Sequence, residues 1–196
     1  MSSISIAPTY SGVNLAERPS RRRRAGALLI DGFIYQVTST ISLIVVGLHL
    51  LLIGRDLELN RFGESAAGSI FDLAVSLFLA LTYFVVFEAI YGATPGKWLL
   101  GMHVVKSDGR RCDTQAAAVR ALCLFFIDGL LLGMVAYLSM QPPLYQRIGD
   151  RIAKTVVVNR CASPTASPFW RFLLATAIYM TIANLAILIF LLICTR

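Results

Sequence analysis

Four long apolar blocks constrain the fold of this chain more than any other feature of its sequence. They run over Ala25–Ile53, Gly68–Tyr91, Ala116–Met140 and Phe169–Ile193. Each block is long enough to cross a hydrocarbon layer of ~30 Å, which takes about 20 helical residues. Lipid admits only helices and closed barrels, and the ~10-residue alternation typical of barrel strands is missing. The blocks therefore predict an all-α, polytopic bundle with four hydrophobic transmembrane spans.

The composition supports a membrane protein and argues against a protein that binds nucleic acid. Of the 196 residues, 57% are hydrophobic and 15% are charged, and the mean hydropathy is +0.70. Soluble domains are nearer half apolar and a quarter charged. The net charge of +7 comes from basic residues that flank the apolar blocks, which is typical of a membrane-topology signal. The cluster Arg21–Arg24 is expected to attract the anionic headgroups of the lipid bilayer.

The sequence divides into a membrane domain with two flanking parts. Residues 1–20 are polar and are expected to be disordered. Residues 21–160 carry three spans, at about 25–53, 68–91 and 116–140. A linker over 161–168 leads to an additional transmembrane helix over 169–196. In the loops, "GMHVV" and "TVVV" are strand-like, and Asp113 or Thr114 is expected to cap the helix that follows.

Two topologies fit the apolar blocks. Four full crossings place the loops Ala93–Gln115 and Gln141–Pro168 on opposite sides of the membrane, and the uninterrupted length of Ala116–Met140 favours this arrangement. The alternative makes Ala116–Met140 re-entrant, with a break at Asp128 and Gly129, and keeps both basic loops in the cytoplasm as the positive-inside rule prefers. Only the alternative lets "GMHVV" and "TVVVN" pair as a small sheet.

Carboxylates inside the apolar blocks are the main candidates for function. A charged Asp near mid-membrane costs on the order of 3 kcal/mol, so Asp31 should face the bundle interior beside a partner. Tyr35, Thr38 and Ser42 follow it at helical spacing on the same stripe, as the candidate lining of an ion or proton pathway. Arg24 lies about two helical turns before Asp31 and is a candidate partner.

Further candidates lie in the second and third blocks. Glu88 stands near the end of the second block, and Asp128 lies deep in the third. The stretch "RALCLFFID", which ends at Asp128, echoes "RAGALLID" of the first block with one extra residue, as a weak internal repeat would. Gly129 and Gly133 form a G-x-x-x-G pair suited to close helix contact, which favours a homo-oligomer.

No cofactor, metal or catalytic site is predicted. "GATPGKW" is one residue too short for a nucleotide-binding G-x-x-x-x-G-K loop and has Trp98 where that loop has Ser or Thr. The four cysteines are scattered, so structural thiols are expected, and His49 and His103 are isolated from each other, so no metal role is expected for either. An enzyme is not expected, because the sequence offers no nucleophile–base pair.

Several motifs together resemble one known family. An Arg with an Asp seven residues later opens the first span, and "GATPGKWLLGMHVVKSDG", "RALCLFFID" and "QRIGDRIAKTVVV" follow. Over about residues 20–160 the chain is similar to the RDD family of bacterial membrane proteins, which is named for one arginine and two aspartates. The resemblance matches Arg24 to the arginine and Asp31 to the first aspartate, and leaves Asp150 or Asp128 for the second. It also implies a motif loop that contains Gly92, Thr94, Pro95, Gly96 and Lys97. Lys154 stands where the family usually has Gly.

The resemblance implies a multi-pass protein of the bacterial inner (plasma) membrane, for which transport of an undetermined ligand, including cation–proton exchange, is the suggested activity. Our first hypothesis is transport of a small ligand or cation, coupled to protons through the intramembrane carboxylates, by a homo-oligomer. The second is a non-transporting scaffold that assembles with another membrane complex, in which the buried charges serve only to pair helices.

Overall fold

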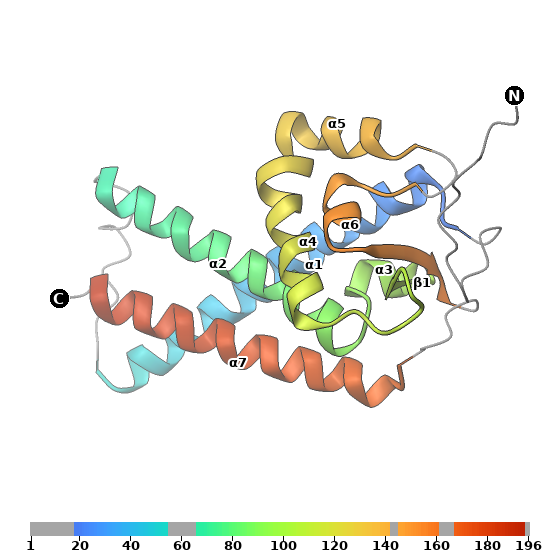
Figure 1. The fold of residues 1–196 in the computed structure, drawn as a ribbon. Helices are drawn as coiled ribbons and strands as arrows, with labels where there is room; N and C mark the ends of the chain where they lie inside the picture. Colours follow the sequence, from blue (N-terminus) through green and yellow to red (C-terminus); the bar gives the residue numbers. More distant parts are fainter. Residues whose placement is uncertain (1–17, 55–65, 142–144, 161–166, 195–196) are drawn as a thin grey trace, which may run out of the picture.

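The computed structural model describes residues 18–54, 66–141, 145–160 and 167–194 (Figure 1). Its elements, in chain order, are α1 (Arg21–Leu52), α2 (Ala66–Ile90), α3 (Pro95–Leu99), β1 (Met102–Lys106), α4 (Thr114–Cys123), the π-helical turn η3 (Leu124–Asp128), α5 (Leu130–Ser139), α6 (Ile148–Ile152), β2 (Thr155–Asn159) and α7 (Phe169–Cys194). The fold is mostly helical with one small sheet, as the sequence predicts. The expectations for the N-terminal tail and for most of the linker concern residues that lie outside these ranges.

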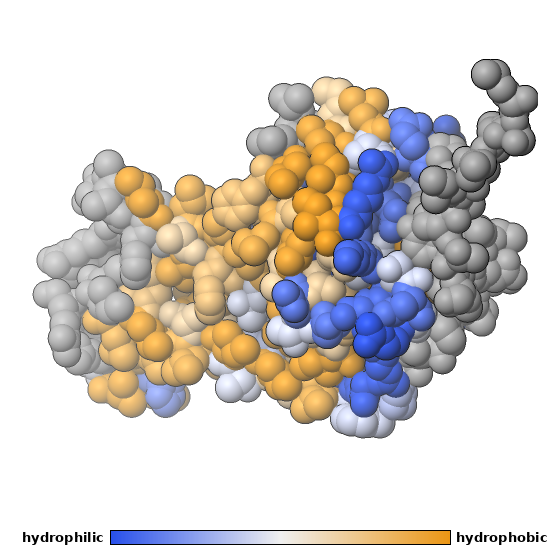
Figure 2. All heavy atoms as spheres, viewed as in Figure 1, coloured by the Kyte–Doolittle hydropathy of each residue, from blue (hydrophilic) through white to orange (hydrophobic). Residues whose placement is uncertain are grey.

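Three helices of the described chain, α1, α2 and α7, are long and apolar enough to span a membrane. Many of their apolar side chains point outward, and Figure 2 shows apolar residues over most of the visible surface, with hydrophilic residues gathered toward one end. Aromatic contacts hold α7 against α2: the ring of Tyr83 lies 5.3 Å from that of Tyr179, and Phe87 lies 5.5 Å from Phe172. This core fixes the position of Tyr83, which the candidate site uses.

The third apolar block bends instead of running straight through the bundle. The helix α4–η3 meets the helix of α5 at 109°, and α5 turns back toward the end of the molecule that holds β1 and α6 (Figure 1). The strands β1 and β2, which precede and follow this block, pair in an antiparallel sheet. Strands cannot pair across a bilayer, so the two loops lie on the same side and the re-entrant arrangement replaces the favoured four full crossings. The four apolar blocks correspond to three long helices and one bent pair.

The bend has a cause in the local backbone. The turn η3 is π-helical, a widening of the helix that often occurs at functional sites. Gly133 has a φ of +83°, a left-handed conformation that glycine adopts at little cost and that interrupts a regular helix. Gly129 and Gly133 therefore mark the bend, and they do not form the flat contact face that G-x-x-x-G would give on a straight helix.

The segment from α3 to β1 recurs from α6 to β2 with the same spacing. Each five-residue helix has glycine as its second residue, Gly96 or Gly149, and the same two-residue connection leads to a five-residue strand. The second residue of that connection is left-handed in both copies, with φ of 63° at Gly101 and 51° at Lys154. Glycine adopts this conformation at little cost, so Lys154 holds a strained backbone position that Gly101 occupies freely in the other copy.

The sheet relates the two copies by an approximate two-fold axis. Its register pairs Val104 with Val157 at the centre, and the flanking pairs exchange when the two copies are swapped. The echo between "RAGALLID" of α1 and "RALCLFFID" of α4–η3 extends the same plan to the preceding helices. The weak repeat in the sequence therefore has a structural counterpart, in which each copy contributes a helix, a short helix and a strand.

Cysteines introduced singly at Asp108 and Lys154, in a cysteine-free background, should react from the same side of the membrane. Both positions are exposed and flank the paired strands β1 and β2. An impermeant maleimide on intact cells and on opened membranes should label the two together or not at all, and a cysteine at Gly54, beyond the other end of α1, should show the opposite behaviour. Labelling of Asp108 and Lys154 from opposite sides would contradict this fold and restore four crossings.

Candidate functional site

Asp31 lies among hydrogen-bond donors contributed by α2 and by the motif loop. It is only 1% exposed. Its carboxylate accepts hydrogen bonds from the Tyr83 hydroxyl at 3.0 Å, the Thr94 hydroxyl at 2.6 Å and the Gly96 backbone N–H at 2.7 Å. Through the last of these bonds, Asp31 satisfies one of the free N–H groups in the first turn of α3. Asp31 is thus buried and well partnered, by neutral donors.

The motif loop has the residues that bring α3 directly onto α1. Thr94 is the N-cap residue of α3, and Pro95 follows at the first helical position, where its fixed φ suits the helix. A Cβ on Gly96 would lie 2.3 Å from the backbone oxygen of Ala27 and 2.9 Å from the carboxyl group of Asp31. Only glycine allows this approach, so the loop and the aspartate depend on each other.

A second cluster joins α1, α2, α4 and α6 through buried ion pairs. The guanidinium of Arg120 is 1% exposed, and its Nε lies 2.7 Å from Oε2 of Glu88. The same guanidinium pairs with Oδ1 of Asp150, whose other oxygen pairs with Arg24. Lys97 of α3 completes the chain of charges by pairing with Glu88. Arg24 therefore binds Asp150, one of the two aspartates that the family resemblance left open, and its shown partner is not Asp31.

The electrostatics of Asp150 indicate a structural role for this cluster. Burial would raise the pKa of its carboxyl, but the neighbouring charges of Arg120, Arg24 and Arg147 overcome that effect and hold the pKa well below its usual range. Asp150 also accepts the backbone N–H of Arg147 at 3.1 Å, which caps the start of α6. Charges that are buried and mutually paired hold together the elements that carry them, because removing any one of them takes a partner away from its buried neighbours.

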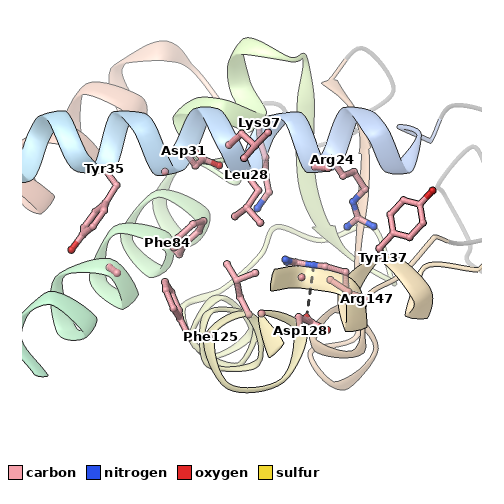
Figure 3. A pocket seen from close by; sticks show the side chains of 18 of the residues that line it. Arg24, Leu28, Asp31, Tyr35, Phe84, Lys97, Phe125, Asp128, Tyr137 and Arg147 are labelled. Atoms are coloured by element: carbon pink, nitrogen blue, oxygen red, sulfur yellow. Dashed lines mark ion pairs between the residues drawn. The ribbon is translucent and has the colours of Figure 1, made fainter. Parts of the chain in front are cut away.

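A cavity of about 590 Å³ lies between α1, α2 and the bent pair α4–η3–α5 (Figure 3). Most of its wall is apolar, with Leu28, Phe84 and Phe125 among the lining side chains. Its charged lining residues are Arg24, Asp31, Lys97, Asp128 and Arg147. Because Arg24, Asp31 and Lys97 already have the partners described above, Asp128 and Arg147 are the charged groups that remain available to a ligand.

Asp128 and Arg147 face each other without a direct hydrogen bond. Arg147 Nε lies 3.9 Å from Asp128 Oδ2, the ion pair drawn as a dashed line in Figure 3. Oδ2 accepts the backbone N–H of Gly149 at 3.3 Å. Among the described residues, neither Asp128 Oδ1 nor Arg147 Nε has a hydrogen-bond partner, although both atoms are buried. An unpaired buried carboxylate oxygen and an unpaired buried N–H each carry a desolvation cost that a bound molecule could relieve.

The other predicted pathway residues are more dispersed. Tyr35 lines the cavity, and its hydroxyl donates to the backbone oxygen of Ser76 on α2. The hydroxyl of Thr38 bonds within its own helix, and Ser42 is fully buried farther along α1. Neither Thr38 nor Ser42 lines this cavity. Gly92 has a φ of +89° and serves the motif loop, because a Cβ there would meet the ring of His103 at 2.5 Å.

Comparison with known proteins identifies the family. The model of the RDD family matches residues 18–154 of this chain. The chain belongs to the RDD family. No curated protein and no solved structure is significantly similar to it. The matched region contains every charged residue of the two clusters, whereas α7 lies beyond it.

Family membership and the apolar helices together make this a multi-pass membrane protein. In this RDD protein the arginine of the first span, Arg24, holds Asp150, while Asp31 holds the motif loop. The site residues predicted from the sequence do not include Arg120, Arg147 or Tyr83. Arg120 opens the echoed stretch in the third block and Arg147 belongs to the "QRIGDR" motif, so both had a signal in the sequence. For Tyr83, the only signal in the sequence was its helical spacing from other polar residues of the second block.

Replacing Asp31 by Asn should destabilise this RDD protein. The carboxylate accepts from three donors through its two oxygens, whereas the Asn amide is neutral and has one acceptor oxygen, so the Thr94 hydroxyl loses its charged acceptor, at a cost of about 1–3 kcal/mol. Thermal unfolding in maltoside micelles should show a lower Tm. The matched control is Asp72→Asn, at an exposed carboxylate of α2, which should leave the Tm unchanged. An unchanged Tm for Asp31→Asn would contradict the structural role of this carboxylate.

Replacing Arg120 by Gln should cost more stability than any exposed charge change. The substitution removes the cation that Glu88 and Asp150 share and leaves Lys97 and Arg24 as their main remaining partners, and breaking a buried pair costs about 3–5 kcal/mol. Adding Glu88→Gln should lower the stability further, because Lys97 then loses its carboxylate partner. Arg110→Gln, which breaks an exposed ion pair with Asp108, is the control and should leave the Tm nearly unchanged, because water screens exposed ion pairs. Equal losses of stability in Arg120→Gln and Arg110→Gln would refute the structural role of the cluster.

Proposed function

We propose that this RDD protein is a membrane carrier that binds a positively charged small ligand or cation at Asp128, in exchange with protons. The cavity between α1, α2 and the bent pair is the binding chamber. Asp128 is the carboxylate that meets the ligand, and Arg147 is the neighbouring charge that sets its selectivity. No catalytic step forms part of this proposal.

The open oxygen of Asp128 is the observation that carries the proposal. Asp128 is 0% exposed, lines the cavity, and its Oδ1 has no hydrogen-bond partner among the described residues. Ionisable groups kept inside membrane segments despite their cost are by default candidates for ion or ligand handling. The bent helix supports the same role, because irregular backbone at membrane depth is tolerated where it lines a cavity or is shielded by protein.

Asp31 is less suited to exchange a ligand, although the sequence favours it. Three donors already surround its carboxylate, and releasing them would detach α3 from α1. We therefore assign Asp31, with Arg24, Glu88 and Asp150, to the framework that shapes the chamber. Tyr35 remains a lining residue of the chamber.

The proposed setting is the inner membrane of a bacterium, with the sheet on the cytoplasmic side. The exposed basic residues Arg110, Arg151 and Lys154 all belong to the segments beside the sheet, which agrees with the positive-inside rule. Anionic lipid would interact mainly with Arg22, since Arg21, Arg23 and Arg24 make contacts inside the protein. A homo-oligomer remains part of the proposal, because one bent pair and three long helices enclose only a partial pathway.

Cation-driven proton movement into proteoliposomes tests the proposal. A sodium or potassium gradient imposed on vesicles that contain the purified protein and a trapped pH-sensitive dye should change the internal pH. Asp128→Asn should reduce this flux at least tenfold, because the amide cannot exchange a proton. Asp72→Asn, an exposed carboxylate outside the chamber, is the matched control and should retain the wild-type rate.

Two results would overturn the carrier. Equal flux in wild type and Asp128→Asn would remove Asp128 from the pathway. Absence of any cation-dependent flux from well-folded wild type would favour the alternative function, a non-transporting scaffold that pairs with another membrane complex. The buried ion-pair cluster is compatible with either function, since it stabilises the fold in both.

A further inference from the structure

We infer that the chamber accepts the headgroup of a zwitterionic aminophospholipid, with the ammonium at Asp128, the phosphate at Arg147 and the start of the acyl chain along α1. This inference rests on the proposed binding of ligand at Asp128 and names the class of that ligand. Three observations support it: the comparison of the two repeats, the chemistry of the Asp128–Arg147 pair, and the distribution of polar and apolar residues along the cavity.

The two halves of the repeat place an aspartate in equivalent positions but give it different partners. Asp31 accepts the backbone N–H of Gly96, and Asp128 accepts that of Gly149, each glycine being the second residue of its short helix. Asp31 also receives two hydroxyl donors. No hydroxyl of the described residues reaches Asp128, whose Oδ1 is left open. The second half therefore lacks internal donors that the first half supplies, and a primary ammonium would replace them.

The residue that replaces Thr94 in the second repeat adds a requirement for an anion. Arg147 precedes α6 as Thr94 precedes α3. The ion pairs of its guanidinium, at 3.9 Å to Asp128 and 3.6 Å to Asp150, are both longer than hydrogen bonds. Its buried Nε has no hydrogen-bond partner among the described residues. Arginine binds phosphate well through its planar, charged N–H groups. A donor for Asp128 and an acceptor for Arg147 are thus needed side by side, which is the pattern of a zwitterion.

The remainder of the chamber suits an apolar chain. Along α1 the lining runs from Arg24 through Leu28 to Tyr35, a length of about 16 Å at the rise of an α-helix. Phe84 and Phe125 face the middle of this stretch from α2 and η3 (Figure 3). Leu29, at 77% exposure, lies on the rim, so a chain in the chamber could continue into the surrounding bilayer. A headgroup without a tail would leave this apolar wall uncovered.

Calorimetric titration of the full-length protein in maltoside micelles with short-chain probes tests the inference. Dihexanoyl phosphatidylethanolamine should bind at least tenfold more tightly than dihexanoyl phosphatidylcholine, whose quaternary ammonium has no N–H to donate to Asp128. The affinity for dihexanoyl phosphatidylethanolamine should also exceed the affinities for dihexanoyl phosphatidylglycerol and hexylamine by a similar factor. Each of these two probes lacks one of the two charges. Free phosphoethanolamine, which has the headgroup but no chain, should also bind at least tenfold more weakly. These comparisons need only the unaltered protein.

Variants separate the contributions of the two side chains. Asp128→Asn and Arg147→Gln should each weaken binding of the phosphatidylethanolamine probe at least tenfold. Arg151→Gln is the matched control, because it removes an exposed arginine of α6, the helix that Arg147 precedes. Among the hydrogen bonds described, the Arg151 guanidinium donates only to the backbone oxygen of Ser139. Binding of the probe should be unchanged in this variant.

Different binding results would refute different parts of the inference. Hexylamine binding that depends on Asp128 but is equal to that of phosphatidylethanolamine, and insensitive to Arg147→Gln, would overturn the zwitterion and leave the proposed cation site intact. Equal binding of phosphoethanolamine and its dihexanoyl lipid would overturn the lipid and retain only the headgroup chemistry. If no probe depends on Asp128, both this inference and the proposed binding site are refuted.

Discussion

The buried guanidinium of Arg120 is the interaction on which the rest of the structure depends. It lies between Glu88 of α2 and Asp150 of α6, and it also donates to Thr155 at the start of β2. Burying charges is costly unless every one of them is paired, so these elements can occupy their positions only together. The cluster thereby holds the bent segment α4–η3 against the long helices, and the shielding of its irregular backbone by protein follows from that packing.

Around this centre the same local arrangement of helix, short helix and strand occurs twice. In each half an aspartate inside a helix receives the backbone N–H of a glycine from a following short helix, and a strand then joins the shared sheet. The two halves differ in what completes the aspartate. In the first half hydroxyl groups saturate Asp31, and in the second half Asp128 keeps an open oxygen beside Arg147. Binding sites between internal repeats are common in transporter folds, and in the proposed function the asymmetry between the copies distinguishes the half that would face a ligand.

The candidate site was only partly accessible to sequence reasoning. Helical spacing correctly indicated that Asp31 is buried and faces other elements, because a carboxylate cannot face lipid cheaply. The partners of Asp31 could not be predicted from the sequence. The seven-residue separation suggested Arg24, whereas the tertiary fold brings Asp150 to Arg24 and the motif loop to Asp31. Arg147 could not be identified from spacing at all. The role proposed for Arg147 rests on its distance to Asp128 and on its equivalence to Thr94, and both of these are properties of the folded chain.

The sequence by itself determined the environment and the elements of this protein: apolar block lengths predicted membrane helices, the family motifs identified the RDD domain, and "GMHVV" and "TVVV" predicted strands that are present as β1 and β2. Helix capping was equally local, and Asp113 accepts the backbone N–H of Ala116 as its position before the third block suggested. Only the tertiary structure decided that the third block bends, because an apolar run of sufficient length satisfies the requirements of a straight span and of a re-entrant one equally well. The pairing of β1 with β2 and the closure of the ion-pair cluster around Arg120 select the bent form, since both need groups that are far apart in sequence to lie on the same side of the membrane.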